Sequence, residues 1–501
     1  MPLHEHSCAH ACLASGPSGA RPFPLPGDEP QWSRPRPFSL DAARLELDLD
    51  LDARRVRGVA TLELKRVDAE ARWVELDAID FEIAAVERGG KPAAYEYDGE
   101  ILRVDLSDVR DAAAEVVVRY ACTPRRGLYF LGPDATRPDR PRQVWTQCQD
   151  QDARHFFPCQ DHPGQRMRTE MIVRVPKGWF ALSNGTLVER KDEGALTRFH
   201  WKQSQPHPAY LVTLAAGELD EAHDEAGPVR VDYYVPKGRG EQIRRSLGRT
   251  PEMIKLFADK LGTPFPWDKY AQIVVTDFIF GGMENTSATT LYERALLDER
   301  AALDVDMEAL VAHELAHQWF GDLVTCRHWS HAWLNEGFAT FFEHVWKEHA
   351  EGRDDYLYGL EQDLEIYLAE HRGRYGRAVV TNVFAEPIDL FDRHLYQKGG
   401  LVLHALREHL GDTLFWRGLQ FYLQRHRGGG VETRDLLRAL EDSSGRSLEE
   451  IFHQWIERPG HPMLELRAEH DEGVLKVTVA QTQARGPPAS ARAPAGRCRA
   501  A

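Results

Sequence analysis

Residues 311–322 read VAHELAHQWFGD, and His313, Glu314 and His317 within them form the pattern H-E-x-x-H. Residues four apart lie on the same face of an α-helix, so the two imidazoles can bind one metal ion while Glu314 lies beside them. The stretch therefore predicts a metal-binding helix. It does not say whether such a metal would serve an enzyme, or which bond that enzyme would attack.

A third metal ligand is expected at Glu336, which follows His317 after eighteen intervening residues. We expect Asn335, directly before it, to cap the second helix that delivers this carboxylate. Two imidazoles and one carboxylate leave the fourth position of a tetrahedron open, as in catalytic zinc sites, although cobalt and manganese accept similar ligands. The sequence thus predicts one Zn2+ per chain, bound by His313, His317 and Glu336.

Two further segments belong with this ligand set. GGMEN, residues 281–285, ends a strand-like run before the metal helix, where paired glycines would let a substrate backbone approach the strand edge. Glu284 in that segment would present a carboxylate at a fixed distance from the metal. Tyr396, in HLYQKGG, offers a phenol that can stabilise a developing oxyanion, and loss of such a donor typically costs about 10²- to 10³-fold in rate.

The rest of the chain divides by its hydrophobic periodicity into a multidomain α+β protein. Residues 37–228 contain short alternating segments between Gly, Pro and Asp turns, among them a hairpin that turns at residues 52–55, and this is typical of a β-rich domain. Residues 229–461 carry apolar residues at helical spacing, with one strand before the metal helix. Residues 462–483 read as two strands that open a small β domain and that must pack on neighbours or fray. A flexible tail is expected at residues 1–36 and a low-complexity tail at 484–501.

Composition narrows the class of protein. A chain of 501 residues allows about three domains, and its net charge of −16 argues against a nucleic-acid partner. No apolar run reaches the roughly 18 residues that would span a bilayer, and the opening stretch does not resemble a secretory signal. The seven cysteines are scattered, which suits reduced thiols. We therefore expect a cytoplasmic protein with no membrane partner; the tract HEHSCAHAC at residues 4–12 leaves a second metal site open.

GGMEN, HELAH with Glu336 eighteen residues on, and Tyr396 ahead of Lys398-Gly399 together resemble the aminopeptidase N family of zinc metallopeptidases, which includes the leukotriene-hydrolysing enzymes. The resemblance covers about residues 37–483. It implies a saddle-like N-terminal β domain, a thermolysin-like, mainly helical catalytic domain and the start of a β-sandwich domain. It also implies catalytic roles for Glu314 (general base, then acid) and Tyr396 (transition-state stabilisation), metal binding by His313, His317 and Glu336, and substrate binding by Gln149, Gly281, Gly282, Met283, Glu284 and Glu343.

The function that this resemblance implies is zinc-dependent release of N-terminal residues from peptides with a free N-terminus. Zinc lowers the pKa of its water from about 15.7 to near 7, so Glu314 needs only to carry one proton to the leaving amine. A substrate ammonium is costly to bury unpaired, and Glu284, with Gln149 beside the amine, would pair it. The role of Glu343, seven residues past Glu336, stays open.

Three alternatives remain at this stage. A zinc endopeptidase is supported only by H-E-x-x-H. An epoxide hydrolase of the leukotriene branch would carry Asp and Tyr eight and five residues before its catalytic tyrosine, where this chain has Ile388 and Phe391, with Asp389 adjacent. An inactive binding or scaffold protein is suggested by the low-complexity stretch that stands where the family usually carries a helical domain. If that end is genuine, we expect a more open site and a less stable protein; side-chain preference, physiological substrate and oligomeric state do not follow from the sequence.

Overall fold

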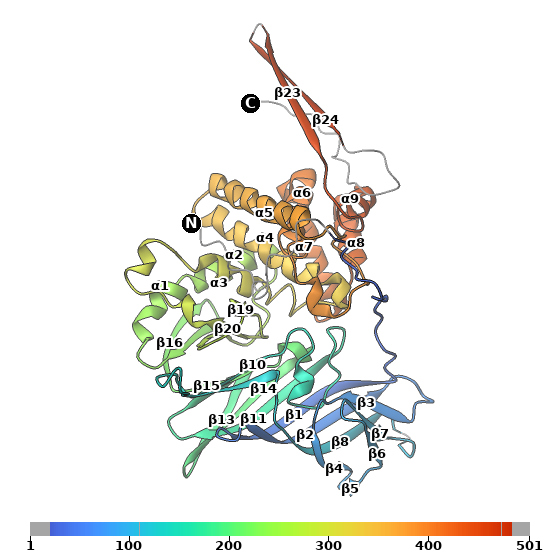
Figure 1. Cartoon of the computed structure of the whole chain (residues 1–501), viewed down its shortest axis with the longest axis vertical. Coiled ribbons are helices and arrows are strands. Elements are labelled where there is room, and N and C mark those ends of the chain that lie inside the picture. The colour runs from blue at the N-terminus through green and yellow to red at the C-terminus, as the bar shows by residue number, and fades with distance from the viewer. Residues whose placement is uncertain (1–20, 110, 472, 483–501) are drawn as a thin grey trace.

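The computed structural model describes residues 21–109, 111–471 and 473–482. A β-rich domain lies at one end of the molecule, a mainly helical domain with its own sheet packs on it, and a long hairpin projects from the far side of the helical domain (Figure 1). The predicted order of a β-rich domain followed by a helical one is confirmed. The expected metal tract at residues 4–12 lies outside the described residues.

The first domain is built from three sheets, of eight, four and three strands, in the orders β13-β14-β11-β1-β2-β8-β4-β5, β12-β15-β10-β9 and β3-β7-β6. Its strands are β1 (Phe38–Asp50), β2 (Arg55–Arg66), β3 (Trp73–Asp77), β4 (Glu82–Arg88), β5 (Lys91–Pro92), β6 (Tyr95–Tyr97), β7 (Ile101–Asp105), β8 (Ala113–Cys122), β9 (Gly127–Leu131), β10 (Gln143–Gln147), β11 (Arg166–Pro176), β12 (Phe180–Ser183), β13 (Thr186–Glu193), β14 (Leu196–Pro208) and β15 (Leu214–Gly217).

The hairpin predicted at the start of this domain is present as β1 and β2, which pair from Phe38↔Arg66 to Asp50↔Arg55. Leu45 and Leu47 of β1 are buried while Glu46 and Asp48 between them are more exposed, so the period-two pattern does set the register. β1 also pairs in parallel with β11, which brings the two halves of the domain into one sheet.

The second domain combines a five-stranded sheet, ordered β16-β17-β18-β20-β19, with nine α-helices among the described residues. Its strands are β16 (Leu219–Ala226), β17 (Val229–Pro236), β18 (Tyr270–Val275), β19 (Gly282–Met283), β20 (Ala288–Tyr292), β21 (Thr325–Cys326) and β22 (Gly430–Val431). Its helices are α1 (Ile243–Leu247), α2 (Thr250–Leu261), α3 (Glu308–Ala316), α4 (Trp333–Ala350), α5 (Arg353–Gly373), α6 (Gln397–Leu410), α7 (Asp412–His426), α8 (Thr433–Ser444) and α9 (Glu449–Trp455).

The boundary between the two domains was expected at residue 228, but the strand pairing around this residue favours an earlier position. β16 and β17 form an antiparallel hairpin from Leu219↔Pro236 to Ala226↔Val229, so the expected boundary falls in the turn between two strands of one sheet. We propose to place it before β16. The alternating polar pattern of β16 resembled the strands that precede it, and only its pairing partner shows which sheet it joins.

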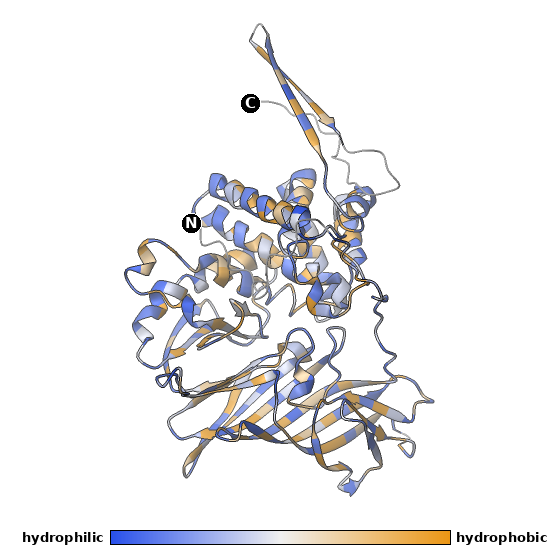
Figure 2. Cartoon of the chain, in the orientation of Figure 1, coloured by the Kyte–Doolittle hydropathy of each residue, from blue (hydrophilic) through white to orange (hydrophobic). Residues whose placement is uncertain are grey.

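The projecting hairpin consists of β23 (Leu464–Asp471) and β24 (Val474–Gln481), which pair only with each other among the described strands. Apolar and polar residues alternate along it (Figure 2). Its large apolar side chains are exposed, and Leu466 and Val474 each have an exposed fraction of 67%. The two predicted strands are therefore present, but neither of their faces packs on the rest of the described chain.

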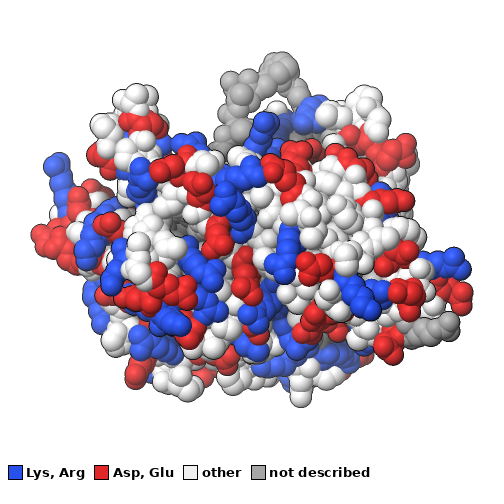
Figure 3. Space-filling model, turned by 90° about the horizontal axis from the view of Figure 1, so that it is seen from below, with Lys and Arg blue, Asp and Glu red and all other residues white. Residues whose placement is uncertain are grey.

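Two surface properties bear on the expected partners. Seen from the side of the first domain, acidic and basic side chains are interspersed and form no continuous basic face (Figure 3). Within the described residues, none of the helices combines the length and the apolar character needed to cross a membrane.

Gly58 provides a test of packing in the first domain. A Cβ atom at this position would lie 2.3 Å from Cζ of Tyr120, whose hydroxyl donates to the carbonyl of Phe156 at 2.7 Å and whose ring stacks on Phe81. We expect Gly58→Val to destabilise the domain by about 1–3 kcal/mol through overpacking, measured as a lower unfolding temperature in calorimetry. The matched control is Arg57→Val, next to it on β2 but exposed, and an equal shift in both variants would contradict this packing argument.

Candidate active site

The three predicted metal ligands meet in one buried place. His313 lies in α3, His317 directly follows the end of that helix, and Glu336 lies in the first turn of α4. The two Nε2 atoms are 3.2 Å apart, and Oε2 of Glu336 lies 3.4 Å from Nε2 of His313 and 3.2 Å from Nε2 of His317. A tetrahedral zinc ion with bonds of about 2.0–2.1 Å would have ligand atoms about 3.3–3.4 Å apart. The donor set and its spacing therefore fit zinc.

Hydrogen bonds of the Nδ1 atoms hold both imidazoles in the orientation that metal binding through Nε2 needs. Nδ1 of His313 lies 2.7 Å from Oε1 of Glu343, and Nδ1 of His317 lies 3.0 Å from the carbonyl oxygen of Phe320. With Nδ1–H donating in both rings, each Nε2 is left to bind a metal. Glu343 was expected among the substrate-binding residues. In the structure its carboxylate contacts His313, a predicted metal ligand, and we propose that it orients this imidazole.

Asn335 does not cap α4, contrary to the expectation from sequence. The helix begins at Trp333, so Asn335 lies within its first turn, and the capping position at Ala332 carries no side-chain cap. The amide of Asn335 instead accepts from the backbone N–H of Cys326 and donates to the hydroxyl of Tyr210, both at 3.2 Å. It thus ties the helix that carries Glu336 to the first domain.

Glu314 lies against β19, the edge strand that contains part of GGMEN. A Cβ atom at Gly282 would be 2.2 Å from Oε1 of Glu314, so only glycine leaves room for the carboxylate there. Glu314 is fully buried. Burial raises the pKa of its carboxyl to about 8, although the imidazoles of His313 and His317 oppose that rise. The location of β19 at the edge of its sheet agrees with the expected approach of a substrate backbone.

Glu284 and Gln149 come together from different domains. Nε2 of Gln149 donates to Oε1 of Glu284 at 3.2 Å and to Oε1 of Glu336 at 3.3 Å, so one amide joins the expected amine-binding residue to a metal ligand. Glu284 is 2% exposed, and burial raises its pKa while the His317 imidazole opposes that rise. The remaining GGMEN residues lie in or beside β19, where Gly282 and Met283 pair with Leu291 and Thr290 of β20, and the carbonyl of Gly281 accepts from the N–H of Tyr292.

Gln318 is a site residue that the sequence reasoning missed. Its Nε2 donates to the carbonyl of Glu284 at 3.1 Å, and its Oε1 accepts from the N–H of Ser287 at 2.8 Å. The side chain therefore attaches both Glu284 and Ser287, at the two ends of this short segment, to the stretch that contains His313 and His317. Its position directly after His317 was the available signal, but no spacing rule connects that position with GGMEN.

Tyr396 lies beside the metal ligands, as the oxyanion role requires. It is buried, it immediately precedes α6, and its ring lies 6.1 Å from that of His313 at an interplanar angle of 22°. Of the positions relevant to epoxide chemistry, Ile388 is 42% exposed and Asp389 is exposed and takes part in a capping box with Glu386. The ring centre of Phe391 lies 6.4 Å from that of Tyr396, but Phe391 has no hydroxyl.

The described residues contain one other cluster with metal-ligating atoms, formed by Glu370, Asp392 and His394. The guanidinium of Arg377 already donates to both carboxylate oxygens of Asp392, at 2.8 and 2.7 Å. A cation would compete with that guanidinium for the same oxygens, so this cluster is a buried ion-pair network and fits a metal poorly.

Comparison with protein families matches both domains. The peptidase M1 N-terminal domain model matches residues 39–211, and the peptidase family M1 domain model matches residues 245–455. Aminopeptidase M1 of Arabidopsis thaliana is 29% identical over 92% of this chain and 54% of its own length. A probable aminopeptidase of Sulfurisphaera tokodaii is 31% identical over 85% of this chain and 54% of its own length. The chain thus spans about half the length of the curated relatives it matches.

Solved structures show the same fold. Yeast LTA4 hydrolase superposes with a TM-score of 0.75 and 22% identity, over 85% of this chain and 69% of that protein. A mutant M1 zinc metallopeptidase from Deinococcus radiodurans, bound to the substrate Tyr-Ser-Ala, superposes with a TM-score of 0.70 and 24% identity, over 84% of this chain and 94% of that one. The predicted combination of a β-rich domain and a helical catalytic domain is confirmed by these likenesses.

The contact between Glu343 and His313 gives a prediction about metal affinity. We expect Glu343→Gln to weaken zinc binding by about 10- to 100-fold, because a neutral amide polarises and orients the imidazole less well than a carboxylate. Competition with a chelator of known zinc affinity would measure it. Glu365→Gln, an exposed position on α5, is the matched control, and equal affinity in both variants would contradict the orienting role.

Proposed function

The chain belongs to the peptidase M1 family, and on that premise we propose that it is a zinc-dependent aminopeptidase that hydrolyses the N-terminal peptide bond of peptides. The observation that carries the proposal is the presence of three buried carboxylates, Glu284, Glu314 and Glu336, around the two histidines. One zinc ion and one substrate ammonium together supply three positive charges. A dication and a free N-terminus would together offset the charges of these three carboxylates.

Each residue then has a distinct task. Glu284 pairs with the substrate ammonium, and the amide of Gln149 lies beside it. Glu314 takes a proton from the attacking water and passes it to the nitrogen of the leaving amine. The hydroxyl of Tyr396 donates to the oxygen of the scissile carbonyl as negative charge develops there. A zinc ion held by His313, His317 and Glu336 would supply Lewis acidity toward that carbonyl and toward a water molecule.

The same charge balance separates an aminopeptidase from an endopeptidase. An internal peptide segment brings no ammonium, so its binding would leave Glu284 buried next to Glu336 with only amide partners. An unpaired buried carboxylate is costly, which disfavours such substrates. The proposal therefore includes peptides with a free N-terminus as substrates and one zinc ion per chain as cofactor; the cytoplasmic location stays a prediction from the sequence.

One peptide in free and N-acetylated forms tests the proposed function. We expect the zinc-loaded protein to cleave the free form and to be at least about 100-fold slower on the acetylated form, because acetylation removes the charge that pairs with Glu284. Glu284→Ala should lose most of this discrimination while it keeps its zinc. Glu314→Gln is the control for a contaminating peptidase, and equal cleavage of both peptides by the wild type would refute the proposal.

Gln318 yields a separate kinetic prediction. Gln318→Leu keeps the volume of the side chain but removes both hydrogen bonds to the Glu284 segment. We expect KM for an aminoacyl arylamide to rise by about 5- to 30-fold, the effect of roughly 1–2 kcal/mol of lost positioning, with a smaller change in kcat and normal zinc content. Loss of zinc, or a fall in kcat with KM unchanged, would show that Gln318 does not position Glu284.

A further inference from the structure

We propose that Lys398 is a positioning residue that sets where the hydroxyl of Tyr396 lies in the site. The role rests on the proposed function, in which Tyr396 stabilises the oxyanion, and it gives a task to a motif residue that this function leaves unused. Lys398 is the second residue of α6, and Tyr396 directly precedes that helix. The carbonyl oxygen of Tyr396 accepts from the N–H of Gly400 at 2.9 Å, so the backbone of the tyrosine is joined to the first turn of α6.

Lys398 occupies a place that disfavours a positive charge. The residue is only 3% exposed, and no described carboxylate forms an ion pair with its ammonium. The first turn of a helix also carries partial positive charge of its own. Burial, and next the guanidinium of Arg377, lower the pKa of Lys398 to about 7, although the carboxylate of Asp392 opposes that shift. An apolar side chain would cost less to bury here, so the lysine indicates a role other than stability.

Neutral groups of two other segments anchor the ammonium of Lys398. Its Nζ donates to the carbonyl oxygen of Gly460 at 3.0 Å and lies 5.6 Å from the centre of the Tyr367 ring. The hydroxyl oxygen of Tyr367 lies 3.4 Å from the same carbonyl oxygen and 3.1 Å from Nδ1 of His461. The first turn of α6 is therefore tied both to α5 and to the short segment that precedes β23.

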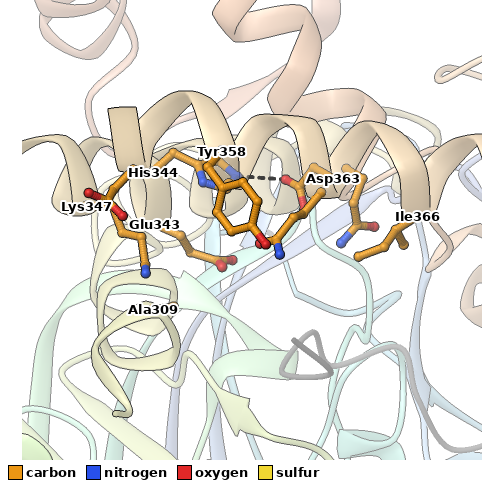
Figure 4. Close-up of a pocket in the computed structure, with 11 residues that line it drawn as sticks. Ala309, Glu343, His344, Lys347, Tyr358, Asp363 and Ile366 are labelled. Atoms are coloured by element: carbon orange, nitrogen blue, oxygen red, sulfur yellow. Dashed lines mark hydrogen bonds and ion pairs between the residues drawn. The ribbon is translucent and has the colours of Figure 1, made fainter. Parts of the chain in front are cut away.

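The helix α5 is itself fixed to the helix that carries Glu336. Nε2 of His344 in α4 lies 2.8 Å from Oδ2 of Asp363 in α5, a contact marked by the dashed line in Figure 4. Tyr367 follows Asp363 by four residues, so both lie on the same face of α5. Through Tyr367 and Gly460, Lys398 holds the start of α6 against a frame that includes a proposed metal ligand.

A second polar anchor holds the backbone before Tyr396. Oδ1 of Asp392 accepts from the N–H of Leu395 at 3.1 Å, and the carbonyl oxygen of Asp392 accepts from the N–H of Tyr396 at 3.2 Å. The guanidinium of Arg377 fixes that carboxylate through both of its oxygens, at 2.8 and 2.7 Å. The tyrosine thus lies between two anchors, with Asp392 on the side before it and Lys398 on the side after it.

The test is a double-mutant cycle of Lys398→Met and Tyr396→Phe, with the zinc-loaded protein and alanine p-nitroanilide as substrate. We expect Lys398→Met to lower kcat by about tenfold, with KM within about twofold of the wild type and normal zinc content. A displaced donor loses part of the roughly 10²- to 10³-fold that complete removal costs. In the Tyr396→Phe background the same substitution should change kcat by less than about twofold. An equal fold-loss in both backgrounds, or an unchanged kcat in Lys398→Met alone, overturns the positioning role.

Lys269→Met is the matched control, since Lys269 is also a buried lysine that donates to backbone carbonyls, those of Ser183 and Ser287. Burial likewise lowers its pKa to about 7. Because Ser287 follows Glu284 by three residues, we expect Lys269→Met to raise KM by about fivefold with little change in kcat. The same loss of kcat at unchanged KM in both lysine variants would show a general effect of removing a buried lysine, and it overturns the specific role of Lys398.

A second variant covers the case in which Lys398→Met does not fold. Gly460 has a φ of +94°, so Gly460→Ala strains the backbone there and shifts the acceptor carbonyl of Lys398. Its control is Gly473→Ala, which introduces a similar strain at a φ of +79° in the turn of the projecting hairpin. We expect kcat to fall by about five- to tenfold in Gly460→Ala only, and again only when Tyr396 is present; an equal fall in both glycine variants overturns the role.

Failure of the proposed function gives a different result. A wild-type protein that does not cleave the arylamide, or a Tyr396→Phe variant as active as the wild type, overturns the function assigned to Tyr396 and the role of Lys398 with it. A large loss in Tyr396→Phe beside a normal kcat in Lys398→Met overturns the role of Lys398 alone.

Discussion

The interaction on which the rest of the structure depends is the mutual repulsion of Glu284, Glu314 and Glu336 in a space from which water is excluded. Three carboxylates cannot remain ionised there without positive charge and hydrogen-bond donors close by. The fold provides a neutral donor, the amide of Gln149, to Glu284 and Glu336, and on the proposed function the metal and the substrate amine would supply the positive charge. On the proposed function, a permanent cation beside Glu284 would occupy the position that the substrate amine needs, whereas the neutral amide of Gln149 leaves that position available.

The first domain contributes residues that contact the candidate site directly. Besides Gln149, Asn184 donates to the carbonyl of Thr286 at 2.9 Å, and the backbone N–H of Gly185 donates to the hydroxyl of Ser287 at 2.8 Å. The buried ammonium of Lys269 donates to the carbonyl of Ser287 at 3.0 Å from the second domain. The segment after Glu284 is thus held from both domains. Residues of the β-rich domain therefore help to fix the position of Glu284, the proposed amine-binding carboxylate.

The parts of the site that the sequence predicts are those with a fixed local spacing. His313 and His317 are one helical turn apart, and Glu336 lies on the next helix, so their meeting follows from a short pattern. The capping role expected of Asn335 was wrong, because the choice among nearby starting points for α4 depends on contacts with Cys326 and Tyr210. The contacts of Gln318 with GGMEN and the place of β16 depend on tertiary pairing, which no periodicity encodes.

The bridge made by Gln149 has a mechanical consequence. Its single amide reaches Glu284, the proposed amine-binding residue, and Glu336, a proposed metal ligand, from a loop of the first domain. A rotation that separated the domains by little more than one hydrogen-bond length would release both carboxylates in the same motion. On the proposed roles of these two carboxylates, a domain movement that alters the amine-binding residue would also alter the hydrogen bonding of a metal ligand.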